Sequence, residues 1–220
     1  MARGKPVLTV ETLCVQAGAF AAAQSKHDEP KLYGVTDGKA VGTYLKGKFI
    51  GLLTDKFDFS RGNSAKGIDL PELRVDIKTT SIRQPQSSSP FSSARQKVFG
   101  LGYSLLVFVY DKVDNRKRAI SRLDIKHVIF VEANRTADHQ TTRGLLEILD
   151  RDGNEEELAA LMRDRMLPAD DVEIQRIARD ALKHRPNLGY LTISNALQWR
   201  LQYKRAINSA GSVDGVVRVH

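Results

Sequence analysis

The chain has 220 residues, 41% hydrophobic and 27% charged, a composition that is typical of a folded protein with a sizeable core and excludes wholesale disorder. It carries 34 Lys and Arg against 26 Asp and Glu, a formal charge of +8, which favours an anionic partner, nucleic acid first and a membrane surface second. The single cysteine, Cys14, excludes an internal disulfide and a cysteine-based zinc site, as in a reducing cytoplasm.

The N-terminal residues 7–23, VLTVETLCVQAGAFAAA, weakly resemble a secretory leader, but Glu11 and Gln16 interrupt the apolar run. No stretch reaches the roughly 18 apolar residues that a membrane span needs. We therefore expect a soluble, cytoplasmic protein without a membrane partner.

The first clear element is a helix predicted over residues 38–57. Thr36 or Asp37 can cap its N-terminus, and the turn-rich stretch SRGNSAKG follows it. Its apolar residues recur at helical spacing; they are Val41, Leu45, Phe49, Leu52 and Leu53.

Three strands are expected next, over residues 73–81, 103–113 and 126–133. In the first, Val75 and Ile77 alternate with polar residues, so one face is apolar and the other carries charges. The second is a continuous apolar run, typical of a central strand covered on both faces. The stretch SSARQKVFG between them is predicted as a short helix or a loop.

Only helices are predicted from residue 135 until the last few residues, where SVDGVVRV alternates like a short strand or hairpin. The helices are expected over 139–153, 154–166, 170–185 and 192–207. The fold class is therefore α/β, with a mixed part over residues 1–134 and a mainly helical part over 135–220. The order helix, helix, hairpin is compatible with a winged helix-turn-helix, and the sequence leaves open whether the two parts are one domain.

Two aspartates and a lysine lie close together in GIDLPELRVDIKTT. Asp76 and Lys78 are two apart on a predicted strand, so they share a face at about 6–7 Å. Pro71 indicates a turn before the strand, and a hairpin-like approach would bring Asp69 to the same place. Phosphodiester hydrolysis uses a hard divalent ion held by one or two carboxylates, and a neighbouring ammonium group can orient water and stabilise negative charge.

Asp69, six intervening residues and Asp76-Ile77-Lys78 resemble the PD-(D/E)xK nuclease motif, most closely in the MutH-like branch with related type II restriction endonucleases. The resemblance covers about residues 38–110 and implies a restriction-endonuclease-like mixed sheet flanked by helices. It implies Asp69 and Asp76 as Mg²⁺ ligands, Lys78 as the residue that orients water, and Asp55 as an accessory acid from the preceding helix.

The chain departs from that branch at two positions, because Asp76 stands where Glu is usual and Ile68 stands where a proline is usual. A D-x-K triplet also occurs by chance in many strands. The alternative interpretation is a solvated Asp76–Lys78 pair, a turn-capping Asp69 and a surface Asp55.

Two regions without carboxylates are predicted to face DNA. Residues 77–110 contain no Asp or Glu, and residues 181–213 contain five Lys or Arg and no acid. Arg, Gln and Ser side chains suit base edges and phosphates. The candidates after the catalytic strand are Arg83, Gln84, Gln86, Ser87, Ser88, Arg95 and Lys97; those on the helix predicted over 192–207 are Asn195, Gln198, Arg200, Gln202, Lys204 and Arg205. The alternative for the first group is a solvated Ser-rich loop.

The residues and the resemblance together predict a Mg²⁺-dependent type II restriction enzyme that cuts duplex DNA and leaves 5′-phosphate and 3′-hydroxyl ends. A homodimer is expected because palindromic sites suit two-fold symmetric proteins, and a cognate DNA methyltransferase is expected in the cell. No nucleotide cofactor is expected, since GVTDGKAVGT lacks P-loop spacing. The alternatives are a MutH-like mismatch-repair nickase and a non-catalytic winged-helix DNA-binding regulator.

Overall fold

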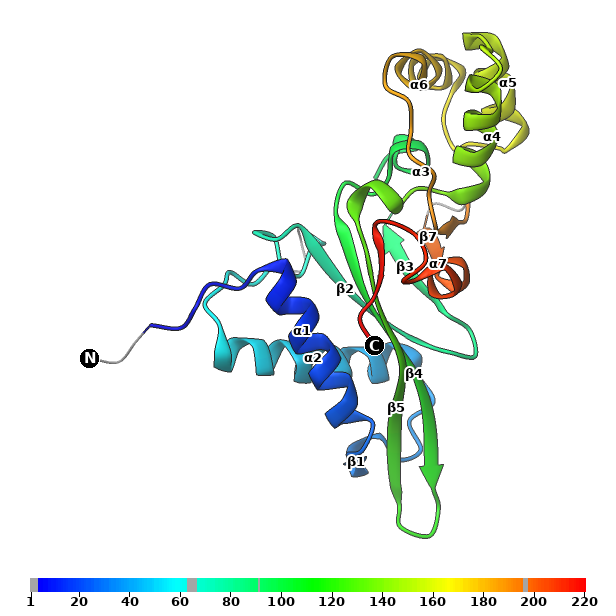
Figure 1. Cartoon of the computed structure of the whole chain (residues 1–220). Helices are drawn as coiled ribbons and strands as arrows, with labels where there is room; N and C mark the ends of the chain where they lie inside the picture. Colours follow the sequence, from blue (N-terminus) through cyan, green and yellow to red (C-terminus); the bar gives the residue numbers. More distant parts are fainter. Residues whose placement is uncertain (1–3, 63–66, 91, 196–197) are drawn as a thin grey trace. The chain divides into compact units, whose positions relative to one another are not determined.

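The computed structural model of the chain describes residues 4–62, 67–90, 92–195 and 198–220 (Figure 1). The chain forms two compact units and passes from one to the other after residues 85, 104, 131 and 209. Unit 1 comprises residues 1–85, 105–131 and 210–220, and unit 2 comprises residues 86–104 and 132–209. Each unit has a sheet and helices of its own.

Unit 1 contains a five-stranded sheet. Its strands are β1 (Asp28–Glu29), β2 (Val75–Ser81), β4 (Ser104–Asn115), β5 (Ile120–Val131) and β8 (Val216–Arg218). The strand order is β1-β5-β4-β2, and β8 also pairs with β5. Every residue from Leu105 to Tyr110 is buried, which confirms the predicted central strand. The third predicted strand is confirmed too, although it already begins at Ile120 because β5 follows β4 as an antiparallel hairpin.

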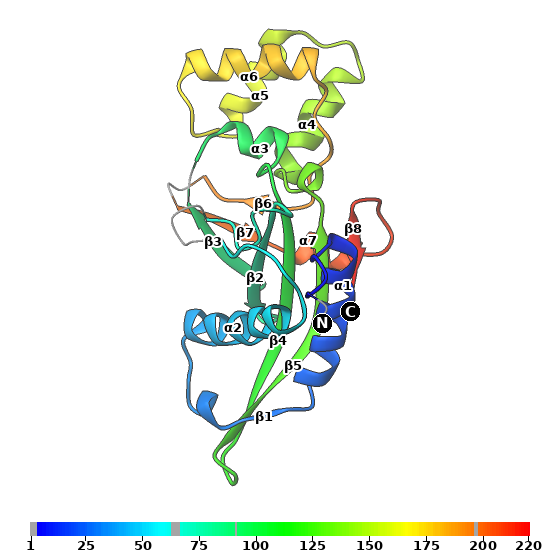
Figure 2. The same cartoon turned by 90° about the vertical axis from the view of Figure 1, so that its left-hand side faces the viewer.

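Two long helices, α1 (Val10–Gln24) and α2 (Gly38–Lys56), pack on the sheet of unit 1. Helix α1 packs against β5 and α2 against β2 (Figure 2). The rings of Phe20, Phe49 and Phe108 meet at centroid distances of 5.2, 5.8 and 5.0 Å, so α1, α2 and β4 share one core. Helix α2 confirms the helix predicted over 38–57, with Asp37 as its N-cap. None of the helices in the described ranges is long and apolar enough to cross a membrane.

Gly42 allows α2 to lie directly on β2. A Cβ atom at this position would lie 2.4 Å from Oγ1 of Thr79, which is closer than side-chain atoms pack. Lys46 is four residues further along and therefore lies on the same face of the helix. The close contact at Gly42 thus directs Lys46 towards the segment that begins β2.

A buried carboxylate connects α1, β1 and α2. Glu29 accepts hydrogen bonds from Gln24 at 2.7 Å, Tyr44 at 2.5 Å and Lys48 at 2.5 Å. Burial alone would raise the pKa of Glu29, but the hydrogen bonds from Lys48, Tyr44 and Gln24 lower it below its ordinary value. A buried charge with this many partners stabilises one orientation of the elements that supply them, here the orientation of α2 relative to α1 and β1.

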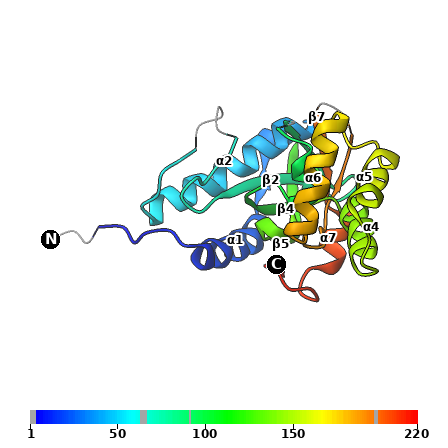
Figure 3. The ribbon, with the colours of Figure 1, turned by 90° about the horizontal axis from the view of Figure 1, so that it is seen from above.

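Unit 2 combines a three-stranded sheet with helices. Its strands, in sheet order, are β3 (Gln86–Pro90), β7 (Gln198–Gln202) and β6 (Thr192–Ile193). Its helices are α3 (Arg95–Phe99), α4 (His139–Leu149), α5 (Glu155–Asp164), α6 (Asp171–Lys183) and α7 (Lys204–Ser209). Helix α5 packs against α4 and α6 (Figure 3), around apolar side chains such as Leu158 and Ile177. The three helices predicted between residues 139 and 185 are confirmed, and α3 decides for the short helix over the loop in the stretch SSARQKVFG, for which the sequence left both open.

The helix predicted over 192–207 is wrong for most of its length. Strands β6 and β7 occupy residues 192–193 and 198–202, and only α7 is helical. The predicted recognition helix of a winged helix-turn-helix is therefore not found in the described part of the chain. Trp199, Leu201 and Tyr203 recur every second residue, and this period fits a strand. Pairing with β3, in a segment predicted to be a loop, stabilises the strand.

Candidate active site

Asp69 lies on a tight turn that precedes β2. Leu70 and Val75 exchange backbone hydrogen bonds of 3.0 and 3.1 Å and so close the hairpin-like turn that was expected around Pro71. The backbone amide of Ile77 donates to Oδ2 of Asp69 at 2.9 Å. The turn and this hydrogen bond hold the carboxylate beside the strand that carries Asp76.

Asp76 and Lys78 project from β2 towards this carboxylate. Nζ of Lys78 lies 2.8 Å from Oδ2 of Asp76, and the two side chains are 17% and 4% exposed. The carboxyl groups of Asp69 and Asp76 lie close enough together that each shifts the pKa of the other. The three residues that form the predicted motif therefore meet at one point of unit 1.

Two carboxyl groups in contact cannot both be ionised without cost. Burial, opposed by the Lys78 ammonium group and reinforced by the Asp69 carboxylate, raises the pKa of Asp76 to about 6. Burial would also raise the pKa of Asp69, but hydrogen bonds with Asp76, Lys46 and the Ile77 amide lower it below its ordinary value. The pair therefore favours a shared proton or a shared cation.

The unsatisfied oxygen of Asp76 fits a divalent cation. Oδ2 of Asp76 is buried, and its 2.8 Å ion pair with Lys78 is not aligned as a hydrogen bond. A buried carboxylate oxygen without an aligned hydrogen bond and a second carboxylate beside it are suitable ligands for a hard ion. No cluster of three or more His, Cys, Asp or Glu suited to a metal is found in the described residues. Mg²⁺ commonly completes such a two-carboxylate site with water and substrate oxygens.

The chain contains a second Asp-Ile-Lys triplet, and comparison of the two triplets shows that burial distinguishes the candidate site from a surface ion pair. Asp124 and Lys126 on β5 form an ion pair of 2.5 Å, and their side chains are 43% and 42% exposed. The first triplet is mostly buried and contacts Asp69, whereas the second is half exposed. The D-x-K pattern alone therefore could not distinguish the site from a solvated pair.

Helix α2 contributes a lysine to the site, which was not predicted. Nζ of Lys46 donates to both oxygens of Asp69, at 2.8 and 3.0 Å. Asp55, the predicted accessory acid, lies nine residues further on, and nine steps of about 100° place it on the opposite face of the helix. It is exposed and lines a shallow pocket with residues that include Phe20 and Lys48. The sequence signal that could have identified Lys46 is its position four residues after Gly42, on the face of α2 that meets β2.

Comparison with known proteins decides the family. A family model described as "Type II restriction enzyme NspV" matches residues 7–218. The chain belongs to the NspV family of type II restriction enzymes. It is 58% identical over 214 residues, 97% of each chain, to the protein named "Type II restriction enzyme NspV" from Nostoc sp. (strain ATCC 29411 / PCC 7524). No solved structure matches the chain. The resemblance to type II restriction enzymes is confirmed, and the PD-(D/E)xK motif is consistent with this NspV-family membership.

The DNA-contact candidates of this NspV-family chain that lie in unit 1 are exposed. Arg83 and Gln84 lie in the turn that follows β2. Nε of Arg83 lies 3.6 Å from Oδ1 of Asp111, and the arginine side chain is 77% exposed. Both residues are accessible from solvent, and their contact with DNA stays a prediction.

The candidates on β3 and β7 divide between two faces of the small sheet. Ser87 hydrogen-bonds the hydroxyl of Tyr203 on the covered face, whereas Ser88 and Arg200 are exposed and Gln86 is half-buried. The side chain of Gln198 lies outside the described residues. Beyond the strand, Lys204 and Arg205 are exposed in the first turn of α7.

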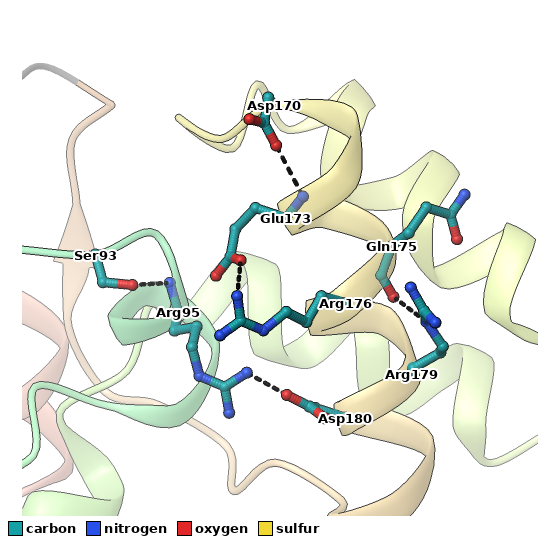
Figure 4. Close-up of polar contacts among 8 residues, drawn as sticks. All are labelled: Ser93, Arg95, Asp170, Glu173, Gln175, Arg176, Arg179 and Asp180. Atoms are coloured by element: carbon teal, nitrogen blue, oxygen red, sulfur yellow. Dashed lines mark hydrogen bonds and ion pairs between the residues drawn. The ribbon is translucent and has the colours of Figure 1, made fainter.

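Three further candidates are engaged inside unit 2. Arg95 forms an ion pair with Asp180 of α6 (Figure 4) and lies 4.7 Å from the centroid of the Phe99 ring. Lys97 is buried and donates to the carbonyl of Ile193 at 3.0 Å and to Oδ1 of Asn195. Burial, only partly offset by the Asp138 carboxylate, lowers the pKa of Lys97. These contacts assign Arg95, Lys97 and Asn195 a structural part in unit 2.

Proposed function

We propose that this chain is a Mg²⁺-dependent, site-specific endonuclease that cuts both strands of duplex DNA and leaves 5′-phosphate and 3′-hydroxyl ends. The observation that carries the proposal is the contact of Asp69 with Asp76, with Lys78 beside them, in a member of a type II restriction enzyme family. Placing two carboxylates side by side destabilises the protein, and a cation bound between them would offset this cost.

In this proposal Asp69 and Asp76 would hold the ion. When bound, Mg²⁺ supplies positive charge for the phosphate oxygens and makes water more acidic. The Ile77 amide and Lys46 keep the Asp69 carboxylate in position. Asp55, on the far face of α2, has no place in this arrangement.

Lys78 is the candidate for orienting the attacking water. Its ammonium group is mostly buried beside Asp76, where a positive charge stabilises developing negative charge more strongly than in bulk water. The water oxygen bonds to phosphorus, the bond from phosphorus to O3′ breaks, and the 3′ oxygen takes up a proton. The attacking water loses a proton to solvent, and the phosphate stays attached to the 5′ oxygen of the downstream nucleotide, which gives a 5′-phosphate end.

Cleavage of plasmid DNA with and without Mg²⁺ tests this function. The parent protein should give discrete fragments only with the ion. Asp76→Asn and Lys78→Ala should each lower the cleavage rate by about 100-fold or more. The matched controls Asp124→Asn and Lys126→Ala change the second Asp-Ile-Lys triplet and should cut like the parent.

Other products would contradict the proposal. Nicked circles that are not converted to linear DNA would indicate a mismatch-repair nickase, and a mobility shift without cutting would indicate a regulator. Cleavage by Asp76→Asn at the parent's rate would exclude this site. A site-specific nuclease would also cut its host's genome, so we propose a cytoplasmic protein accompanied by a cognate DNA methyltransferase.

A further inference from the structure

Strands β3 and β7 join two distant parts of the sequence into one antiparallel ribbon (Figure 2). Ser88 pairs with Arg200 and Gln86 with Gln202, while Ser87 pairs with Leu201. Successive side chains of a strand point to opposite faces. The first two pairs therefore share one face of the ribbon, and the third lies on the other.

The two faces have different chemistry. On the covered face Ser89, Trp199 and Leu201 are buried. On the other face Ser88, Arg200 and Gln202 are exposed. The guanidinium group of Arg200 has no hydrogen bond or ion pair to any residue that the structure describes. No carboxylate occurs on β3, β6 or β7, and the exposed side chains described on this face are the hydroxyl of Ser88, the guanidinium of Arg200 and the amide of Gln202.

The spacing of these groups matches the step of a DNA duplex. Residues two apart on a strand are separated by about 6.6–6.8 Å, which is twice the rise of about 3.4 Å per base pair. A two-stranded ribbon also fits the width of the major groove. Gln86 and Ser88 on one strand, with Gln202 and Arg200 opposite, can therefore reach alternate base pairs.

We propose that this face of the β3–β7 ribbon lies in the major groove of the target duplex and distinguishes its bases, with Arg200 and Gln202 as specificity-determining residues. The inference rests on the proposed cleavage of duplex DNA. Arginine forms paired hydrogen bonds with guanine, and glutamine does so with adenine. A surface that only bound phosphates would be expected to carry several Lys or Arg side chains, whereas this face of the ribbon carries a single arginine, Arg200.

The rest of unit 2 holds the ribbon rigidly. The aromatic side chains of Trp199 and Tyr203 are fully buried beneath it. Buried Lys97 ties the carbonyl of Ile193 to the side chain of Asn195, and so fixes the end of β6. Base discrimination needs such support, because hydrogen bonds in pairs tolerate little displacement.

The proposal is tested by selecting bound duplexes from a pool with randomised central base pairs, with Ca²⁺ in place of Mg²⁺, and sequencing them. Arg200→Lys keeps the charge but loses the planar fork. It should lose preference at one guanine of the enriched site by roughly 10- to 100-fold, while affinity for random duplex stays within about twofold. Gln202→Ala should lose preference at a different base pair. Arg143→Lys, an exposed arginine of α4, should keep the parent's preference.

The outcomes separate this inference from the proposed function. If Arg200→Lys and Gln202→Ala enrich the same sequence as the parent with the same ratios, the ribbon does not contact bases. Equal losses on enriched and random duplexes would place Arg200 on phosphate and also overturn the inference. A parent that selects a sequence but never cuts plasmid would refute the proposed endonuclease and leave the ribbon's part in recognition standing. Melting temperatures equal to the parent's confirm that the variants are folded.

Discussion

At the scale of single residues, surroundings decide which Asp-Ile-Lys triplet belongs to the site. Asp76 is buried against Asp69 and Lys78, whereas Asp124 is half exposed beside Lys126. A half-exposed pair of this kind contributes little to stability. The buried pair forces like charges together, and natural proteins keep such destabilising contacts mainly where they serve function.

We predict that Asp76→Asn makes the metal-free protein more stable near pH 8. Burial is the main reason that the pKa of Asp76 is raised to about 6 from 3.8. A carboxyl group with a raised pKa stabilises the fold fully below its unfolded pKa, and this contribution is lost as the pH rises through about 6. Asparagine keeps the shape without the charge, so the gain should be on the order of 1–3 kcal/mol.

Thermal unfolding of parent and variant in EDTA, followed from about pH 8 to pH 4, measures this gain. The difference in melting temperature should shrink as the solution becomes more acidic. Asp124→Asn should show no such gain at either pH. A variant that melts below the parent at the higher pH would mean that the two carboxylates do not repel each other.

At the scale of elements, the packing of α2 on β2 builds the site. Gly42 permits the close approach, and Lys46 on the same face reaches Asp69. Helix α2 itself was predictable from its apolar spacing and from Asp37. The close approach of α2 to β2 was not predictable, because it depends on Thr79, which lies far from Gly42 along the chain.

We predict that Gly42→Ala destabilises the protein by about 1–3 kcal/mol, since its methyl group would collide with Thr79. Gly47→Ala is the matched control on the same helix. It has nothing within 4 Å of its added Cβ, so it should stabilise by about 0.5–1 kcal/mol through helix propensity. Denaturant unfolding measures both changes.

Combining Gly42→Ala with Thr79→Ala should recover part of the loss, because the colliding hydroxyl is then absent. Failure of the second substitution to help would show that α2 and β2 are not in contact at this point. Gly42→Ala should also weaken cleavage if the displaced helix no longer holds Lys46 against Asp69, and the Gly47→Ala control should not.

At the scale of the whole molecule, the excess of Lys and Arg over Asp and Glu lies almost entirely in unit 1. Unit 1 contains 20 Lys and Arg against 13 Asp and Glu, and unit 2 contains 14 against 13. Affinity for DNA that does not depend on sequence comes mainly from cations near phosphates. We therefore expect unit 1 to supply most of the salt-dependent affinity, while the ribbon of unit 2 supplies discrimination.

We predict that the protein binds its target as a homodimer, because a two-fold symmetric site needs each half contacted in the same way. Sedimentation with a short duplex that carries the selected site should give two copies of the 24.5 kDa chain per duplex. A single copy per duplex, with the two strands cut in separate binding events, would contradict this expectation.

The sequence by itself determined the motif and most of the regular elements. The period of the apolar residues predicted α2, β2 and the helices between residues 139 and 185, and a continuous apolar run predicted β4, since these signals are local and extend over many residues. The spacing from Asp69 to Lys78 was likewise sufficient to predict the trio that the structure brings together.

Only the tertiary structure decided what depends on contacts between distant segments. Residues 198–202 suit either a helix or a strand, and their pairing with β3, more than a hundred residues earlier, selected the strand. The same pairing placed Arg200 and Gln202 on one exposed face. Lys46 reached Asp69 through the packing of a helix on a strand, and burial distinguished Asp76 from Asp124. Local periodicity carries no information about partners remote in sequence, and these features follow from such partners.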